Sequence, residues 1–244
     1  MPQHLRRDGK PALAYHHRPG TGPTIVFLPG YMSDMTGGKA TELDAWAERT
    51  GHAMLRLDYA GCGASEGVFA KQTLASWRVD VLDIVNALVE GPVLLVGSSM
   101  GGWLMLLAAQ ALGERVAGLV GIAAAPDFTE WGFDERRREM LMADGLLAEK
   151  TAYAETPTIT TRAFWESGQA HLLLGGEIPY DGPVRLLHGL DDADVPPSIA
   201  FRLGRALRSG DVQTILVKGG DHRLSRPGDL RLLIATVSSL VEPI

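Results

Sequence analysis

The segment PVLLVGSSMGGWLMLL, residues 92–107, decides the fold of this chain. An apolar run ends at Gly97, a glycine-rich turn holds Ser99, and a second apolar stretch follows from Gly101 onward. Such a turn between a strand and a helix keeps a serine in a strained backbone position, with its hydroxyl above the end of the sheet. Glycines beside it let strand and helix pack closely. If strands and helices alternate on both sides, the pattern predicts a nucleophilic serine at position 99.

Short apolar runs do alternate with longer amphipathic segments along the rest of the chain. We expect strands at Ile25–Leu28, Ala53–Leu57, Val93–Val96, Val116–Ile122, Val184–Leu187 and Val212–Val217. We expect helices at Lys39–Thr50, Leu74–Leu88, Met100–Leu112, Ser198–Arg208 and Pro227–Leu240. Continuous apolar strands between helices are typical of a mostly parallel sheet that is covered on both faces. The prediction is an α/β core formed by residues 1–126 and 182–244.

Residues 127–181 interrupt this alternation with aromatic and apolar residues mixed among charges. A structureless loop of that length is unusual in a compact domain. We therefore predict an inserted helical cap over the carboxyl ends of the strands. The alternative is a peripheral pair of helices without contact to a substrate.

A serine nucleophile needs a base to take its proton, and the base needs a carboxylate to orient it. His222 follows the expected strand Val212–Val217 after a short glycine-rich link. Parallel strands share one edge at their carboxyl ends, so His222 is expected at the same edge as Ser99. The chain holds seven histidines, and only His222 has this loop position.

This reasoning does not decide which aspartate is the carboxylate partner of His222. Asp191, Asp192 and Asp194 follow the expected strand Val184–Leu187, whereas Asp127 follows an earlier strand. The chain order serine, aspartate, histidine favours the 191–194 loop over Asp127. It does not separate the three aspartates of that loop.

An oxyanion formed on an attacked carbonyl needs two preorganised N–H donors. The backbone N–H of Met100, the residue after the serine, is one candidate. Tyr31 is the other candidate, in the loop that follows the first strand. Pro29 has no N–H to donate, and Gly30 permits a close approach of the backbone.

Four apolar residues are candidates for lining a substrate pocket: Met32, Met35, Trp131 and Phe133. Methionine side chains adapt to irregular apolar shapes, which would suit a medium or long acyl group or a flat aromatic one. Methionines are equally common as ordinary core residues, so both interpretations stand.

Five segments carry a family resemblance: FLPGYMSDMTG (27–37), LDYAGCGASEG (57–67), VGSSMGGWLML (96–106), LLHGLDDADVP (186–196) and DHRL (221–224). They resemble the α/β-hydrolase superfamily, and within it the branch of mitochondrial acyl-protein thioesterases and mycophenolic acid acyl-glucuronide esterases. The resemblance implies that Ser99 is the nucleophile and His222 the base. It selects Asp192, the aspartate of an HGxxDxxVP pattern, as the acid. It also implies that no cofactor and no metal are used.

Composition excludes several other classes of protein. The net charge is −6 without a basic patch, which argues against a nucleic-acid partner. The longest apolar runs are too short to span a bilayer, and the first residues do not form a signal peptide. Cys62 is the only cysteine, so an intrachain disulfide is excluded. We expect a cytoplasmic location, or a mitochondrial one if a transit segment has been removed.

Together these patterns predict a serine hydrolase that cleaves acyl esters or thioesters of small molecules or acylated proteins. Two alternatives stand beside it. One is another serine hydrolase on the same fold, either an aminopeptidase or a carbon–carbon bond hydrolase, because fold does not decide chemistry. The other is a non-enzymatic ligand-binding protein. The complete set of serine, histidine and aspartate argues against the second, since binding alone does not need all three.

Overall fold

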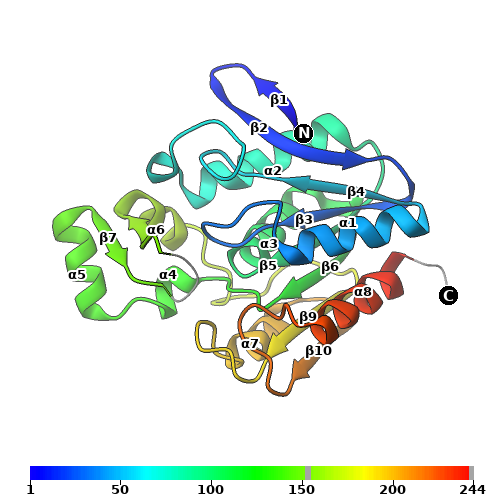
Figure 1. The fold of residues 1–244 in the computed structure, drawn as a ribbon. Helices are drawn as coiled ribbons and strands as arrows, with labels where there is room; N and C mark the ends of the chain where they lie inside the picture. Colours follow the sequence, from blue (N-terminus) through cyan, green and yellow to red (C-terminus); the bar gives the residue numbers. More distant parts are fainter. Residues whose placement is uncertain (152–154, 242–244) are drawn as a thin grey trace.

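A computed structural model describes residues 1–151 and 155–241, which form an eight-stranded sheet in the order β1-β2-β4-β3-β5-β6-β9-β10 (Figure 1). The strands are β1 (Gln3–Arg7), β2 (Lys10–Arg18), β3 (Thr21–Leu28), β4 (His52–Leu57), β5 (Val93–Ser98), β6 (Val116–Ile122), β9 (Val184–Gly189) and β10 (Val212–Val217). The β1–β2 and β2–β4 pairs are antiparallel, and the remaining neighbours are parallel. The loops after the parallel strands therefore meet at one edge of the sheet.

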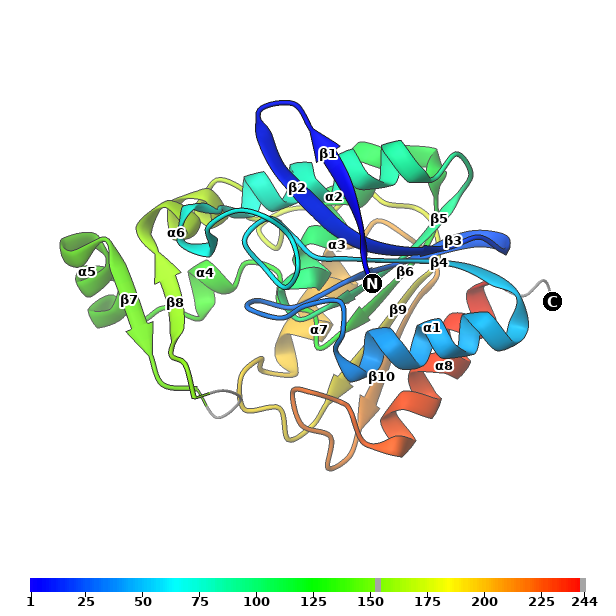
Figure 2. The ribbon, with the colours of Figure 1, turned by 45° about the horizontal axis from the view of Figure 1, so that its top comes forward.

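Helices cover both faces of this sheet (Figures 1 and 2). On one face lie α1 (Gly38–Thr50) and α8 (Pro227–Val241), whose apolar residues pack with those of the central strands. On the other lie α2 (Leu74–Leu88), α3 (Met100–Leu112) and α7 (Ser198–Ala206). The central strands are buried on both sides, which is why their sequences are continuously apolar. The α/β-hydrolase fold class expected from the sequence is confirmed.

Local signals explain where the helices begin and end. Thr73 caps α2, because its hydroxyl accepts from the N–H of Ser76 while the Ser76 hydroxyl accepts from the N–H of Thr73. Gly51 ends α1 with a φ of 77°, a left-handed conformation that favours glycine. The hairpin of β1 and β2 was not expected, since these strands are half-exposed and lack a continuous apolar run.

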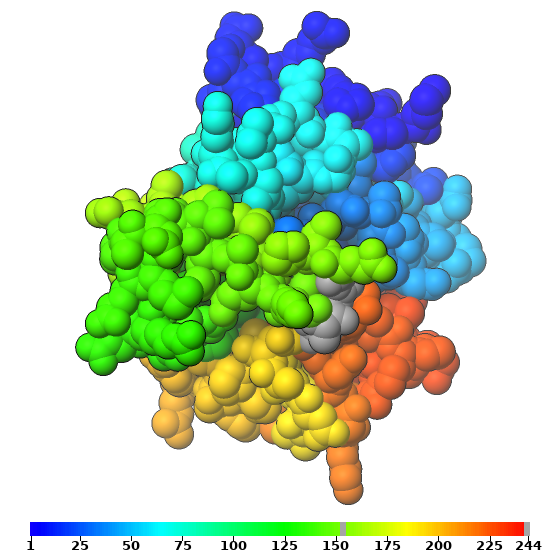
Figure 3. Space-filling view, turned by 60° about the vertical axis from the view of Figure 1, so that its left-hand side comes forward, coloured from blue at the N-terminus to red at the C-terminus, as the bar shows by residue number. Residues whose placement is uncertain are grey.

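The segment between β6 and β9 differs from the purely helical insertion expected for residues 127–181. It contains α4 (Phe128–Trp131), α5 (Glu135–Asp144), β7 (Leu146–Glu149), β8 (Thr158–Thr161) and α6 (Arg162–Gln169). The strands β7 and β8 pair antiparallel as a small second sheet. The sequence of β8, TITT, is wholly β-branched and favours a strand over a helix. Figure 3 shows this green segment lying against the core, between a cyan segment and the yellow segment near residue 190.

Asp127 ties the two ends of this insertion together. It is fully buried at the start of α4, and its carboxylate accepts hydrogen bonds from the N–H groups of Leu173 and Leu174 at 2.7–3.0 Å. Burial raises the pKa of Asp127, and those two backbone donors oppose the rise. The first residue of the insertion is thus bonded to residues that follow its last helix.

Within residues 1–151 and 155–241, no helix combines the length and the apolar character that crossing a bilayer requires.

Candidate active site

Ser99 lies in the sharp turn between β5 and α3. Its φ is 54° and its ψ is −121°, which is rare for a residue with a side chain and marks the strain expected of this turn. Its N–H donates to the Ile122 carbonyl at 2.9 Å, and its carbonyl accepts from the N–H of Ala125 at 3.0 Å. These two bonds to the end of β6 hold the serine in its strained position.

The glycines around Ser99 are required by close packing. A Cβ on Gly97 would lie 2.4 Å from the Gly101 carbonyl oxygen, and a Cβ on Gly101 would lie 2.1 Å from the Leu28 carbonyl oxygen. Any side chain at either position would force the start of α3 away from the sheet. The turn therefore needs glycine on both sides, for the reason that the sequence pattern suggested.

The structure brings Ser99, His222 and Asp192 into one hydrogen-bonded chain. His222 Nε2 lies 3.0 Å from Ser99 Oγ, and His222 Nδ1 lies 2.9 Å from Asp192 Oδ2. Ser99 follows β5, Asp192 follows β9, and His222 follows β10, so three strand ends supply the three groups. In this arrangement Nδ1–H donates to the carboxylate, which leaves Nε2 to accept the serine proton.

The loops that carry Asp192 and His222 are joined to each other by main-chain bonds. The N–H of Asp191 donates to the Gly220 carbonyl at 2.9 Å, and the N–H of Leu190 donates to the Val217 carbonyl at 2.9 Å. A Cβ on Gly189 would lie 2.2 Å from the Gly220 carbonyl oxygen, so the two loops touch where glycine is present. The spacing between the carboxylate and the imidazole is therefore set by the backbone.

The Asp192 carboxylate is buried and surrounded by donors. Its Oδ1 accepts from the N–H groups of Asp194 and Val195 at 2.9 and 2.8 Å, and its Oδ2 lies 3.3 Å from His188 Nε2. Burial alone would raise the pKa of Asp192, but hydrogen bonds from His188, His222 and Val195 outweigh it and hold the pKa well below its usual range. Asp192 is therefore a carboxylate at neutral pH.

The other aspartates considered for this place differ from Asp192 in burial or in their bonding partners. Asp191 and Asp194 are exposed on the same loop, and Asp127 is used to bind the end of the insertion. Chain order favours the loop of Asp191, Asp192 and Asp194 over Asp127 and does not separate the three aspartates of that loop. Only the folded loop shows that the Asp192 carboxylate faces His222.

The backbone of Gly30 and Tyr31 runs directly beside Ser99. A Cβ on Gly30 would lie 3.3 Å from the Cβ of Ser99 and 3.4 Å from the Ser98 carbonyl oxygen. Met100 is the first residue of α3, and the first N–H groups of a helix have no partner within that helix. The two residues chosen as oxyanion donors thus flank the serine from two different elements.

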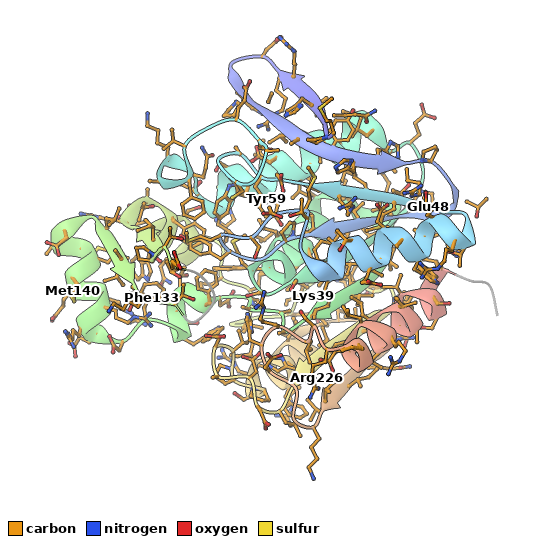
Figure 4. The ribbon with its side chains drawn as sticks, in the orientation of Figure 1. Lys39, Glu48, Tyr59, Phe133, Met140 and Arg226 are labelled. Carbon is orange, nitrogen blue, oxygen red and sulfur yellow. The ribbon has the colours of Figure 1, made fainter. Side chains whose placement is uncertain are left out.

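A pocket of about 640 Å³ opens above Ser99 and His222. Its lining includes Met32, Trp131 and Phe133 of the predicted pocket residues, with Trp131 and Phe133 contributed by the insertion. In Figure 4, Phe133 lies on the core side of the insertion, whereas Met140 lies at its outer end. The pocket is therefore lined jointly by the core and by the insertion.

The expectation for Met35 was wrong. Met35 is 2 % exposed and belongs to the interior rather than to the lining of this pocket. Its N–H donates to Asp58 Oδ1 at 2.7 Å, and its carbonyl accepts from Arg56 at 2.8 Å. Both bonds draw Met35 toward the end of β4, so this methionine is a core residue.

Sequence reasoning did not identify the charged part of the pocket lining, which includes Lys39, Arg137, Lys150 and Arg223. Lys39, in the first turn of α1, donates from Nζ to the Arg223 carbonyl at 2.5 Å (labelled in Figure 4). Burial and the nearby Arg223 charge lower the pKa of Lys39 to about 8. No sequence signal points to this contact, because it depends on α1 starting beside the loop that carries His222.

One group in the described residues has the composition of a metal site. Ligand atoms of Asp192, Asp194 and His222 lie within 4.8 Å of one another, a proximity that their sequence spacing did not indicate. The Asp192 oxygens already accept bonds from backbone N–H groups and from His222. His222 Nδ1 carries the proton of that bond and cannot ligate a metal at the same time. The donors present fit an oriented histidine better than a metal ion.

Comparisons with known proteins identify the family. The sequence profile of the alpha/beta hydrolase family matches residues 25–231. The chain is 40% identical to the human protein named palmitoyl-protein thioesterase ABHD10, mitochondrial, over 98% of this chain and 79% of that protein. The mouse protein of the same name is also 40% identical, over 98% of this chain and 82% of its own length.

Two solved structures show the same likeness. Alpha/beta hydrolase domain-containing protein 10 from mouse superimposes with a TM-score of 0.93 at 39% identity, covering 98% of each chain. A putative hydrolase from Agrobacterium vitis S4 superimposes with a TM-score of 0.93 at 37% identity, covering 99% of each chain. The chain belongs to the alpha/beta hydrolase family and is a hydrolytic enzyme.

Proposed function

We propose that this protein hydrolyses acyl thioesters and acyl esters through an acyl-enzyme on Ser99. The observation that carries the proposal is the chain Ser99–His222–Asp192, with its 3.0 and 2.9 Å contacts, at the base of the pocket. A nucleophile, a base and an orienting carboxylate in this order are the machinery of acyl transfer. The relatives named as thioesterases support a thioester as one substrate.

The reaction proceeds in two halves. Ser99 Oγ attacks the acyl carbonyl while His222 Nε2 takes the hydroxyl proton, and Asp192 stabilises the imidazolium that forms. The N–H groups of Tyr31 and Met100 stabilise the oxyanion. His222 then gives its proton to the departing thiol or alcohol. A water molecule, activated by the same imidazole, releases the acid and restores Ser99.

The acyl group is proposed to lie in the half of the pocket formed with the insertion. Met32, Phe128, Trp131 and Phe133 line this part, and the whole cavity of about 640 Å³ lies in the ~300–1,000 Å³ range of ligand pockets. Apolar and aromatic walls of this kind suit a medium or long acyl chain. Residues 127–181 then act as the cap that completes the acyl site on the core of residues 1–126 and 182–244.

The proposal concerns a small-molecule ester or an acylated protein as substrate. The relatives carry the word mitochondrial in their names, which differs from the cytoplasmic location that we expect. The cytoplasmic location stays a prediction.

A panel of acyl-CoA thioesters and p-nitrophenyl esters of graded chain length tests the proposed substrate class. We expect kcat/KM to rise by about fourfold for each added CH2 until the pocket is filled, because each buried CH2 contributes about 0.8 kcal/mol. Aminoacyl amides of matched size serve as the control and should be turned over far more slowly. Amide hydrolysis that outpaces both esters and thioesters would instead favour the aminopeptidase alternative.

Chelation tests the assignment of metal-free chemistry. Because the Asp192 carboxylate and His222 Nδ1 are bonded to each other, we expect EDTA to leave kcat and KM unchanged. Steady-state kinetics before and after dialysis against the chelator provide the measurement. Loss of activity that a divalent ion restores would contradict metal-free chemistry.

A further inference from the structure

The loop that holds the proposed oxyanion donor is bonded to Ile159 of the insertion through two consecutive residues, Tyr31 and Met32. The hydroxyl of Tyr31 donates to the Ile159 carbonyl at 2.7 Å. The N–H of Ile159 lies 3.4 Å from Met32 Sδ, which accepts from it. Both main-chain groups of Ile159 are therefore bonded to consecutive residues of the loop beside Ser99.

The position of Ile159 in its strand explains how it reaches this loop. Ile159 is opposite Ala148 in the antiparallel pair of β7 and β8. In such a pair, alternate residues turn their N–H and C=O groups away from the partner strand. The outward groups of Ile159 face Tyr31 and Met32, so the small sheet of the insertion presents its edge to the oxyanion loop.

The ring of Tyr31 reinforces this connection. It packs against Phe164 of α6 and Phe128 of α4 with centroid distances of 4.8 and 5.9 Å. It also contacts Phe69 and Trp77 of the core at 5.3 and 5.8 Å. Burial raises the pKa of the Tyr31 hydroxyl above its usual range, so the group stays protonated and remains a donor. Tyr31 thus joins insertion and core directly beside the site.

The backbone after Tyr31 is strained, so the loop needs bonds to its surroundings to keep this conformation. Met32 has a φ of 54°, a conformation that residues with side chains adopt only where their surroundings hold them. On the core side, Tyr59 donates to the Pro29 carbonyl at 3.0 Å, and the N–H of Ser33 donates to the Gly30 carbonyl at 3.2 Å. The bonds from Tyr31 and Met32 to Ile159 supply the anchor on the opposite side.

We propose that the Tyr31 hydroxyl is a positioning group for catalysis, which sets the direction of the Tyr31 N–H by fastening its loop to Ile159 of the insertion. The insertion is then a structural support of the oxyanion site as well as a wall of the pocket. The inference rests on the proposed function, because it assigns the Tyr31 N–H to the oxyanion of acyl transfer. It predicts that removing the Tyr31 hydroxyl, which is bonded to the Ile159 carbonyl, lowers the rate of the chemical step.

The test replaces Tyr31 by phenylalanine, which retains the ring, the backbone N–H and the aromatic contacts. We expect kcat for a thioester substrate to fall by about tenfold to a hundredfold, the effect of a small misplacement of a catalytic group. KM should change by less than about twofold, because oxyanion donors act mainly on the transition state. Ser99 adds to the carbonyl of an acyl trifluoromethyl ketone and forms an adduct that carries an oxyanion. The affinity of the variant for this inhibitor should fall by the same factor as its kcat/KM.

Tyr180→Phe is the matched control. The Tyr180 hydroxyl is also buried and also donates to a backbone carbonyl, that of Val116 at 3.3 Å, at the opposite end of the central strands. The Tyr180→Phe variant should change the midpoint of thermal unfolding as Tyr31→Phe does, and it should leave kcat unchanged. Equal kcat values for Tyr31→Phe, Tyr180→Phe and the wild-type protein would overturn the inference.

Failure of this inference is distinguishable from failure of the proposed function. If only the positioning role is wrong, the wild-type protein hydrolyses thioesters, a fluorophosphonate labels Ser99, and Tyr31→Phe retains full activity. If the proposed function is wrong, the wild-type protein itself neither turns over the acyl panel nor reacts at Ser99. A loss in Tyr31→Phe that appears only as a raised KM would also overturn the inference, because it would place the hydroxyl in substrate binding.

Discussion

Replacing Ser99 by alanine is expected to lower kcat by about 10⁴-fold or more while the protein stays folded. The hydroxyl supplies the atom that bonds to the acyl carbon, and the imidazole 3.0 Å away then has no proton to accept. The oxyanion donors and the pocket persist in the variant, so a residual rate above that of water alone is expected. Single-turnover and steady-state assays with one thioester and one ester provide the measurement.

Ser98→Ala is the natural comparison, because Ser98 is the neighbouring hydroxyl and ends β5. A fluorophosphonate should label the wild-type protein and Ser98→Ala, and it should leave Ser99→Ala unlabelled. Circular dichroism should show equal folded content in all three proteins. If purified Ser99→Ala retained near-wild-type turnover, the acyl-enzyme mechanism would be wrong and the non-enzymatic role of this serine would need explaining.

Asp192→Asn is expected to lower kcat by about 10³–10⁴-fold with little effect on folding. An amide at this position can donate to His222 Nδ1, which favours the imidazole tautomer that carries its proton on Nε2 and so cannot accept from Ser99. The imidazolium formed during attack also loses its counter-charge. Because hydrogen bonds hold the pKa of Asp192 well below its usual range, the wild-type carboxylate stays ionised throughout the neutral range.

The neighbouring aspartates test whether the effect is specific to Asp192. Asp191→Asn and Asp194→Asn alter exposed carboxylates of the same loop and should each cost about tenfold or less. Asp127→Asn should leave kcat nearly unchanged and should instead weaken the tie between Asp127 and Leu173 and Leu174. A loss of 10³-fold or more in any of these three, with Asp192→Asn mild, would reassign the acid.

Asp192 also makes the stability of the fold depend on pH. Its lowered pKa decides in which direction stability changes with pH. A carboxylate with a lower pKa in the folded protein than in the unfolded chain stabilises the fold above the unfolded value of about 3.9. That contribution is lost as the pH falls through the folded-state pKa. Because asparagine does not titrate, the free energy of unfolding should depend less steeply on pH below about 3.9 in Asp192→Asn than in the wild-type protein.

Much of the fold and the nucleophile follows from local sequence. The strand–turn–helix of residues 92–107 can form only with glycine where a Cβ would collide with backbone, at Gly97 and Gly101. Continuous apolar strands between amphipathic helices leave a buried parallel sheet as the arrangement that covers both faces. His222 was identified for a related reason, since a parallel sheet brings the ends of β5 and β10 to one edge. These inferences depend on short-range patterns and on one topological rule.

Tertiary structure decided what short-range patterns could not. Chain order favoured the loop of Asp191, Asp192 and Asp194 without separating the three, and only the fold of this loop shows the Asp192 carboxylate bonded to His222. Met32 and Met35 were equivalent by sequence, yet main-chain bonds to Arg56 and Asp58 hold Met35 in the interior.

The bonds from Tyr31 and Met32 to Ile159 join residues 128 and 127 positions apart. Ile159 exposes its N–H and C=O toward them only because β7 and β8 pair in one register. Periodicity and motif spacing describe neighbours along the chain, so they determined the sheet and the serine. Contacts between distant segments depend on how the assembled elements pack, so the acid, the pocket wall and the support of the oxyanion loop were decided by the tertiary structure.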